Sequence, residues 1–200
     1  CLKQDIITNN NFRRAFLKGL FAAEGHVKHS VYNTIESISF SFNPHNEYFL
    51  VEFVQKCLNI EGIKTNIGYD IIYLCGYENM LKFYTLGITG LNENKAVKFT
   101  HLCKNASIVL HFKNDLLNKL KDKISQRKLS KYLGCSQSAI SKSYKNRYFP
   151  MMKLCKILEY VGIEKKDLIN YTDYITVRTS IIRDKKSIKF LISNKLEIIE

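Results

Sequence analysis

The strongest constraint on the fold of this chain is a short apolar segment that ends in a carboxylate. Residues 16–25 have the sequence FLKGLFAAEG, which predicts a largely buried helix. At 100° per residue, one face of this helix carries only small side chains, namely Ala15, Gly19, Ala22 and Ala23. Glu24 lies away from the basic stripe of the helix, and Gly25 is a natural left-handed helix stop.

The face of small residues has a chemical consequence. Small residues let two helix backbones approach closely, so two such helices would bring two Glu24 carboxylates and their neighbouring carbonyls together. Carboxylate and carbonyl oxygens are the ligands that hard divalent cations prefer. The segment therefore predicts a divalent-metal site between two helices. The simpler alternative is an alanine-rich core helix that ends at a capping glycine.

The same residues carry a resemblance to a known family. Leu17 to Gly25, LKGLFAAEG, resembles the nine-residue motif of the LAGLIDADG homing endonucleases, and residues 12–16 resemble its usual lead-in. The resemblance implies that two motif helices pack side by side and that Glu24, with the adjacent Ala23, binds Mg²⁺ or Mn²⁺. Ala22 departs from the pattern because it replaces the first acid of the motif, at a position with a capping role in the family.

The pattern beyond the motif extends the resemblance. Residues 36–43 alternate with period two, which predicts a half-buried strand paired with 26–33. A helix is expected over 47–58, a second hairpin over 65–70 and 71–77, and a short helix over 80–86. This is the αββαββα succession of the LAGLIDADG saddle. We expect the fold class to be α+β, with a LAGLIDADG endonuclease-like domain at 1–112.

The resemblance also implies roles for individual side chains. In this family the polar strand faces contact bases in the DNA major groove, and short polar side chains suit such contacts. Lys95 occupies the place of a lysine near the scissile phosphate and is expected to be catalytic together with Glu24. Plain solvent exposure is the alternative for each strand residue. The strand residues expected to contact DNA are Lys28, Tyr32, Asn33, Ser39, Ser41, Asn43, Lys64, Asn66 and Tyr69.

Charge is distributed unevenly along the chain. Residues 1–100 contain 10 Lys and Arg against 9 Asp and Glu, whereas residues 101–200 contain 21 against 9. Within 104–148 there are 11 basic residues and only two acids. Such a concentration indicates a surface that neutralises phosphates, although a solvated lysine-rich helix face is the alternative.

A second motif lies in this basic region. Residues 125–142 predict a helix stopped by Gly134 and a following helix capped by Ser136, and they resemble a phage-repressor-type helix-turn-helix. Leu129, Leu133, Ala139 and Ile140 would form its core. We expect an all-α DNA-binding domain at 113–170; a generic helical bundle is the alternative. The residues expected to contact DNA are Gln126, Gln137, Ser138, Lys142, Lys145 and Arg147.

The final segment, 171–200, alternates in two stretches around residues 175–181 and 188–192. This pattern predicts a C-terminal β-hairpin extension. Six widely spaced cysteines indicate neither a zinc site nor a disulfide framework. No stretch is apolar enough to span a membrane, so we expect a cytoplasmic, DNA-associated protein without a small-molecule substrate.

The motif occurs once, so one chain supplies one acid where the family needs two. We therefore predict a homodimer that cleaves a near-palindromic double-stranded DNA site through metal-activated water. A non-cleaving sequence-specific DNA-binding protein or transcriptional regulator on the same scaffold is the main alternative. An intein fragment is a third hypothesis, suggested by Cys1 and disfavoured because residues 2–11 do not resemble a splicing block.

Overall fold

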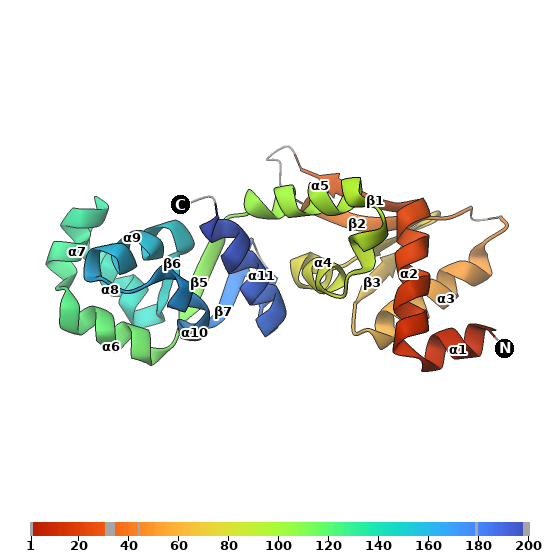
Figure 1. Cartoon of the computed structure of the whole chain (residues 1–200). Coiled ribbons are helices and arrows are strands. Elements are labelled where there is room, and N and C mark those ends of the chain that lie inside the picture. Colours follow the sequence, from red (N-terminus) through yellow and green to blue (C-terminus); the bar gives the residue numbers. More distant parts are fainter. Residues whose placement is uncertain (1, 31–34, 44, 179, 198–200) are drawn as a thin grey trace. The chain divides into compact units, whose positions relative to one another are not determined.

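The computed structural model describes residues 2–30, 35–43, 45–178 and 180–197 of the chain. The chain divides into two compact units, Cys1–Ala106 and Ser107–Glu200. Both units combine helices with an antiparallel sheet (Figure 1), so the predicted α+β class is confirmed.

The first unit contains the predicted αββαββα succession, from α2 to α4. A short helix precedes it, and a 3-10 turn and a further helix follow it. The elements are α1 (Leu2–Thr8), α2 (Asn10–Glu24), β1 (Gly25–His29), β2 (Ile35–Ser41), α3 (Tyr48–Ile60), β3 (Thr65–Ile67), β4 (Ile71–Leu74), α4 (Gly76–Thr85), η1 (Ile88–Leu91) and α5 (Glu93–Lys104). The strands form one antiparallel sheet in the order β1-β2-β4-β3.

An aromatic cluster attaches the motif helix to the sheet. Phe21 of α2, Phe40 of β2 and Phe83 of α4 are each fully buried. Their ring centroids lie 5.0 to 5.8 Å apart, in edge-to-face arrangements. Ile38 and Phe40, two positions apart along β2, are both fully buried, so the period-two pattern correctly predicted this covered face of the strand. Ser39, on the other face, is buried as well, at 5% exposed.

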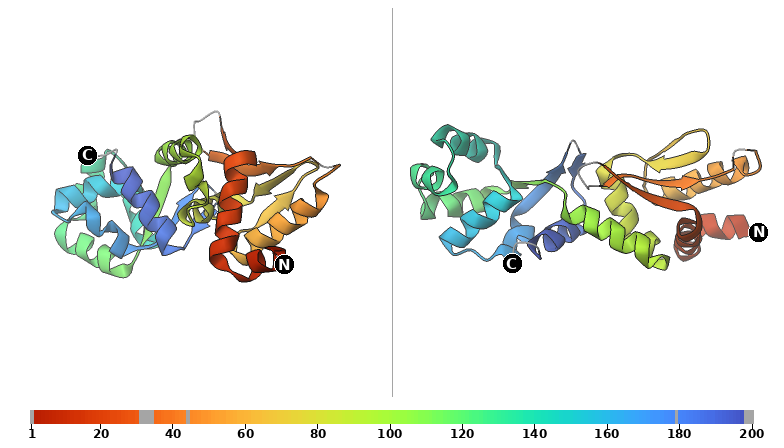
Figure 2. Two further views of the ribbon diagram at one scale, coloured as in Figure 1. Left: turned by 45° about the vertical axis from the view of Figure 1, so that its right-hand side comes forward. Right: turned by 90° about the horizontal axis from the view of Figure 1, so that it is seen from above.

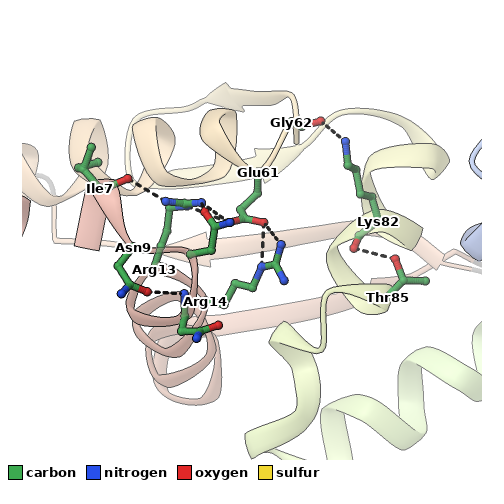
Figure 3. Close-up of polar contacts among 10 residues, drawn as sticks. Ile7, Asn9, Arg13, Arg14, Glu61, Gly62, Lys82 and Thr85 are labelled. Carbon is green, nitrogen blue, oxygen red and sulfur yellow. Dashed lines mark hydrogen bonds and ion pairs between the residues drawn. The ribbon is translucent and has the colours of Figure 1, made fainter. Parts of the chain in front are cut away.

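A buried ion cluster holds the start of α2 against the end of α3 (Figure 3). Arg13 donates through Nε to Glu61 Oε1 at 2.8 Å and through Nη1 to the carbonyl of Ile7 at 2.8 Å. Arg14 donates through Nε to the second oxygen of the same carboxylate at 2.9 Å. The side chains of Arg13 and Glu61 are each only 3% exposed, whereas that of Arg14 is 42% exposed. Glu61 therefore carries two guanidinium partners in a nearly dry site.

The second unit combines several helices with another four-stranded sheet. In both views of Figure 2 the helices α6 to α9 form one group. The strand order is β6-β5-β7-β8, with antiparallel neighbours throughout. The elements are β5 (Ile108–Phe112), α6 (Asn114–Lys123), α7 (Gln126–Leu133), α8 (Gln137–Asn146), β6 (Tyr148–Pro150), α9 (Met151–Val161), η2 (Lys165–Asp167), α10 (Leu168–Tyr171), β7 (Thr172–Val177), β8 (Ser180–Ile182) and α11 (Lys185–Leu196).

Two details of the sequence-based prediction are wrong in this unit. The region around the helix-turn-helix is not all-α, because β6 pairs with β5 and β5 pairs with β7. The C-terminal segment does contain the hairpin β7–β8, but residues 188–192 are helical and not a second strand. Ile188, Leu191 and Ile192 are all buried, which is the spacing of a helix face, and Asp184 caps this helix by accepting from the Ser187 backbone N–H at 2.8 Å.

The predicted domain boundaries at residues 112 and 170 stay a prediction. In the structure, β7 from the third predicted part pairs with β5, which ends at Phe112. A sheet formed by strands from separate sequence segments is therefore shared across both predicted boundaries.

We expect Glu61→Gln to lower the free energy of unfolding by about 3–5 kcal/mol, because Arg13 would remain buried without an anion. Arg14→Gln is the matched control: it removes the exposed partner and should cost less than about 1 kcal/mol. Urea denaturation of both variants measures the difference. Equal losses would show that the buried pair does not stabilise the α2–α3 junction.

Candidate functional site

The motif helix α2 presents its small residues at the surface. Leu17 and Phe21 are fully buried against the unit, whereas Ala15, Gly19 and Ala23 are exposed and Ala22 is half-buried. A Cβ atom added at Gly19 would meet nothing within 4 Å. This face, which we call the small-residue stripe, therefore has no partner among the described residues of the protomer. It leads directly to Glu24, whose side chain is exposed at the C-terminus of the helix.

Two exposed apolar side chains flank the stripe. Phe12, one turn before Ala15, is 56% exposed, and Leu91 of the neighbouring turn η1 is 62% exposed. The turn η1 packs against α2 within the same unit. Small residues bordered by exposed large apolar ones are typical of a surface that contacts another protein.

Lys95 lies at the C-terminus of α2, a contact that the sequence-based interpretation did not foresee. Its Nζ donates to the carbonyl oxygens of Phe21 at 2.8 Å and Ala22 at 2.9 Å, and it lies 5.3 Å from the centroid of the Phe21 ring. Lys95 thereby caps the negative end of the helix dipole. Asn92 caps α5 by accepting from the Lys95 backbone N–H at 3.1 Å, which fixes the start of the helix that carries this lysine.

The Lys95 ammonium and the Glu24 carboxylate are electrostatically coupled. Partial burial lowers the pKa of Lys95 below its ordinary value, and the Glu24 charge acts in the opposite direction. Lys95 therefore holds the end of the helix from which Glu24 extends. Its expected catalytic role stays a prediction, as do the metal-binding roles of Glu24 and Ala23.

Gly25 ends the motif for a different reason from the one expected. Its backbone is extended, with φ −81° and ψ 147°, and not left-handed. A Cβ at this position would lie 2.0 Å from the Cδ2 atom of Phe21, so any side chain would collide with the buried ring. Glycine is required here because the strand leaves the helix across the face of Phe21.

The face of the first sheet opposite the aromatic cluster carries four of the nine predicted strand contacts, one of which, Ser39, is only 5% exposed. Strand register places His26, Ser39, Tyr73 and Asn66 in one row across β1, β2, β4 and β3. We call this row, together with Lys28, Ser37, Ser41 and Ile71, the open sheet face. Of the predicted residues, Lys28, Ser39, Ser41 and Asn66 belong to it.

The sequence-based interpretation missed the apolar Ile71 and three further members of the open sheet face. His26, Ser37 and Tyr73 share the alternation of their strands, and pairing His26 with Ser39 and Ser39 with Tyr73 would have identified two of them. Lys28 already has a partner within the sheet, because its Nζ lies 3.5 Å from Glu36 Oε1 in an exposed ion pair.

The remaining predicted strand residues lie at strand ends or outside the described residues. Lys64 and Tyr69 are exposed next to β3, with Tyr69 79% exposed. Asn43 is exposed but organises the turn before α3, since its Oδ1 accepts from the His45 N–H at 3.1 Å. Tyr32 and Asn33 fall in the segment 31–34, which the structure does not describe.

A groove of about 600 Å³ runs between β1 and α5 beside the end of α2. Its lining includes His26, Lys28 and Ser39 from the sheet and Lys95 and Lys98 from α5. The groove thus joins the open sheet face to the lysine that caps the motif helix. Its basic lining suits a phosphate backbone.

In the second unit, α7 and α8 form the helix pair that the sequence predicted. Ser125 caps α7, Gly134 ends it in the left-handed conformation with φ 62°, and Ser136 caps α8. Leu129 and Ile140 are buried as expected. Leu133 is only half-buried and Ala139 is exposed, so Ala139 is not a core residue.

The exposed residues of α8 form one continuous helix face. Of the predicted contacts, Gln137, Ser138, Lys142 and Lys145 lie on it, and the structure adds Ser141. Gln126 and Arg147 are half-buried and line a hollow next to Lys145. The geometry therefore brings all six predicted helix-turn-helix contacts to α8 or its immediate surroundings.

Comparison with protein families divides the chain in a similar way. Residues 11–87 match the LAGLIDADG-like domain, and residues 102–189 match the Bacteriophage CII protein family. The first match supports a DNA-binding protein of the homing-endonuclease type. The second extends from α5 to α11 and is loosely consistent with a phage regulator-like region, without singling out a repressor-type helix-turn-helix. No curated protein and no solved structure matches the chain.

Two features are absent from the residues that the structure describes. No group of three or more His, Cys, Asp and Glu side chains is arranged to hold a metal ion there. None of the helices in the same residues has the length and apolarity needed to cross a membrane.

We expect Lys95→Met to loosen the C-terminus of α2, because two carbonyls lose a charged donor, worth about 1–2 kcal/mol locally. Amide hydrogen exchange at residues 25–27 should become faster. Lys98→Met is the matched control, since Lys98 is exposed on the same helix. Identical protection in the two variants would exclude a capping role for Lys95.

Proposed function

We propose that this protein is a divalent-metal-dependent DNA endonuclease that acts as a homodimer on a near-palindromic double-stranded site. The observation that carries the proposal is the small-residue stripe of α2, which is exposed except at the half-buried Ala22 and ends at the exposed Glu24. A carboxylate at the C-terminus of a helix lies beside negative carbonyls. A cation bound between this helix end and that of a second copy of α2 would offset the negative charge of the carboxylates and of the carbonyls.

The dimer follows from the shape of the stripe. With no side chain at Gly19 and methyl groups at Ala15 and Ala23, two copies of α2 can pack closely about a twofold axis. Phe12 and Leu91 would cover the ends of this contact and lose their exposure. Each protomer would then present Glu24 next to the axis.

The donor set suits a hard cation. A carboxylate oxygen from each Glu24, with backbone oxygens next to Ala23, would hold Mg²⁺ or Mn²⁺. Such an ion activates water and stabilises the leaving oxygen of a phosphodiester. Lys95 keeps the helix end fixed by binding the Phe21 and Ala22 carbonyls, so that the direction of Glu24 is set before DNA arrives.

DNA recognition would be divided between the units. The open sheet face supplies short polar groups suited to base edges, and the exposed face of α8 supplies Gln137, Ser138 and Lys142. Because both surfaces belong to one chain, binding by one raises the effective concentration of the other. The helix-turn-helix contacts would lengthen the footprint on each side of the cleavage site.

The second candidate is a non-cleaving DNA-binding regulator that uses α2 only as a dimer interface. The match of residues 102–189 to a bacteriophage protein family favours it, as does the single carboxylate that each protomer offers. In such a protein Glu24 has no chemical role, so its replacement would leave dimerisation unchanged and alter DNA affinity at most slightly.

We expect Glu24→Gln to abolish Mg²⁺-dependent cleavage of a plasmid library, by about 10³-fold or more. DNA affinity should be unchanged or slightly higher, because a negative charge near the phosphates is removed. Glu52→Gln, at an exposed position of α3, is the control and should cleave normally. Wild-type binding without cleavage in Mg²⁺ or Mn²⁺ would establish the regulator instead.

We expect Gly19→Leu to separate folding from assembly. A Cβ at this exposed position meets nothing within 4 Å, and leucine favours a helix over glycine by up to about 1 kcal/mol, so protomer stability should not fall. The same side chain would block close helix approach, giving a monomer in sedimentation and no cleavage. Gly19→Ala should remain closer to the wild type. A Gly19→Leu protein that still dimerises and cleaves would refute the proposed interface.

A further inference from the structure

Three cationic side chains, one from α6 and two from the end of α8, converge in the second unit without a described counter-ion. A hollow of about 420 Å³ is lined by Lys121 of α6, Lys145 of α8 and Arg147 at the end of α8. Its other polar lining groups include Asn114, Gln126 and Ser141, and no carboxylate lines it. Within the described residues no ion pair involves any of the three cations. Within the described residues the protein itself supplies no anion to these three cations, so an anion from outside would find their charges uncompensated by the fold.

The residue that ends α8 is an arginine in a backbone conformation that favours glycine, which indicates a role for its side chain. The helices α7, α8 and α9 all end in a left-handed residue, namely Gly134, Arg147 and Gly162. Glycine adopts this conformation without steric cost, whereas a residue with a Cβ is disfavoured. Only α8 has an arginine there, with φ 53° and ψ 46°. The guanidinium donates to Asn114 Oδ1 at 3.4 Å, which directs it toward α6 and the hollow.

A buried hydroxyl in the same lining has no partner. Tyr144 is 3% exposed, and within the described residues its hydroxyl makes no hydrogen bond. Unpaired buried polar groups are costly and uncommon. The ring of Tyr144 thus forms part of the wall of the hollow, with its hydroxyl left unpaired behind it.

The donors match one ligand chemistry. A planar guanidinium, two ammonium groups, amide N–H groups and hydroxyls together are the set that binds phosphate oxygens. The hollow lies beside the exposed face of α8, and Ser141 and Lys145 belong to both. A phosphate held there would be adjacent to whatever that face contacts.

We propose that this hollow binds one phosphate of the DNA backbone and fixes the register of α8 on the duplex, with Lys121 of α6 as a contact outside the helix-turn-helix. The proposal rests on the proposed function, because it takes the phosphate to belong to the DNA that α8 contacts. A free phosphate or phosphorylated small molecule has the same chemistry. The experiment therefore separates the two sources.

The central variant is Arg147→Gly, which removes the guanidinium and leaves a residue that favours the left-handed conformation, so thermal stability should not fall. Arg178→Gly is the matched control, since Arg178 is the other described non-glycine residue with a positive φ, at 54°, and does not line the hollow. Lys121→Gln tests the contact from α6. Affinity for several unrelated duplexes is measured against salt concentration for the full chain.

We expect Arg147→Gly and Lys121→Gln each to reduce the slope of log K against log salt by about 0.9. Each should weaken binding by up to about tenfold, equally on every duplex. Arg178→Gly should leave the slope unchanged. Equal slopes for all three variants would overturn the proposal, because the effect would then be one of net charge alone.

Two further measurements distinguish the sources and the underlying assumption. Calorimetric titration with inorganic phosphate should show no tight binding; tight binding lost in Arg147→Gly, with unchanged DNA slopes, would assign the hollow to a free ligand and overturn the proposal. Lys142→Gln tests α8 itself. If Lys142→Gln weakens DNA binding and Arg147→Gly does not, the phosphate site fails alone. If neither has an effect, the helix-turn-helix assignment fails with it.

Discussion

The architecture of the first unit depends on how α2 is held, because one side of this helix has no partner in the protomer. A helix with an open face cannot be fixed by packing all round, so its two ends must be fixed instead. At the N-terminus, Glu61 binds Arg13 and Arg14, and at the C-terminus Lys95 binds the last carbonyls. Between them, Leu17 and Phe21 bury the inner face. The helix that carries the exposed stripe is thus held at both ends and along its inner face, and the stripe itself remains accessible.

The two ends differ in what they leave for function. The Glu61 cluster is nearly dry and satisfies its charges internally, so it stabilises a junction and offers nothing to solvent. Lys95 instead satisfies carbonyls of the helix and leaves the Glu24 carboxylate without a direct ion pair in the described structure. An exposed carboxylate at a negative helix end is the kind of ligand that the proposed metal site would use. The contrast separates a structural charge cluster from a candidate functional one.

The sequence predicted what local periodicity encodes. Alternation along β2 identified Phe40 as buried and Ser39 as facing the other way, and the stop at Gly134 and the cap at Ser136 identified two helices. Contacts between distant segments were not accessible in this way. Lys95 and Phe21 lie 74 positions apart, and β5 pairs with β7 across the whole helix-turn-helix. The role of Gly25 was misjudged for the same reason, since its constraint is the Phe21 ring and not a local turn. In α11, alternation and helical spacing coincide over a few apolar residues, so the period of the pattern could not distinguish a helix from a strand there.

Charge divides the recognition problem in a physically reasonable way. Residues 1–100 are nearly neutral, with 10 basic against 9 acidic residues, whereas residues 101–200 have 21 against 9. A nearly neutral sheet face gains little from counterion release and must discriminate by hydrogen bonds to base edges. A strongly basic helical unit gains affinity on any sequence. If one chain both finds DNA and selects a site, the second unit supplies the salt-sensitive binding energy. The open sheet face, beside Glu24, then has to favour the correct site only by the smaller free energies of direct base contacts.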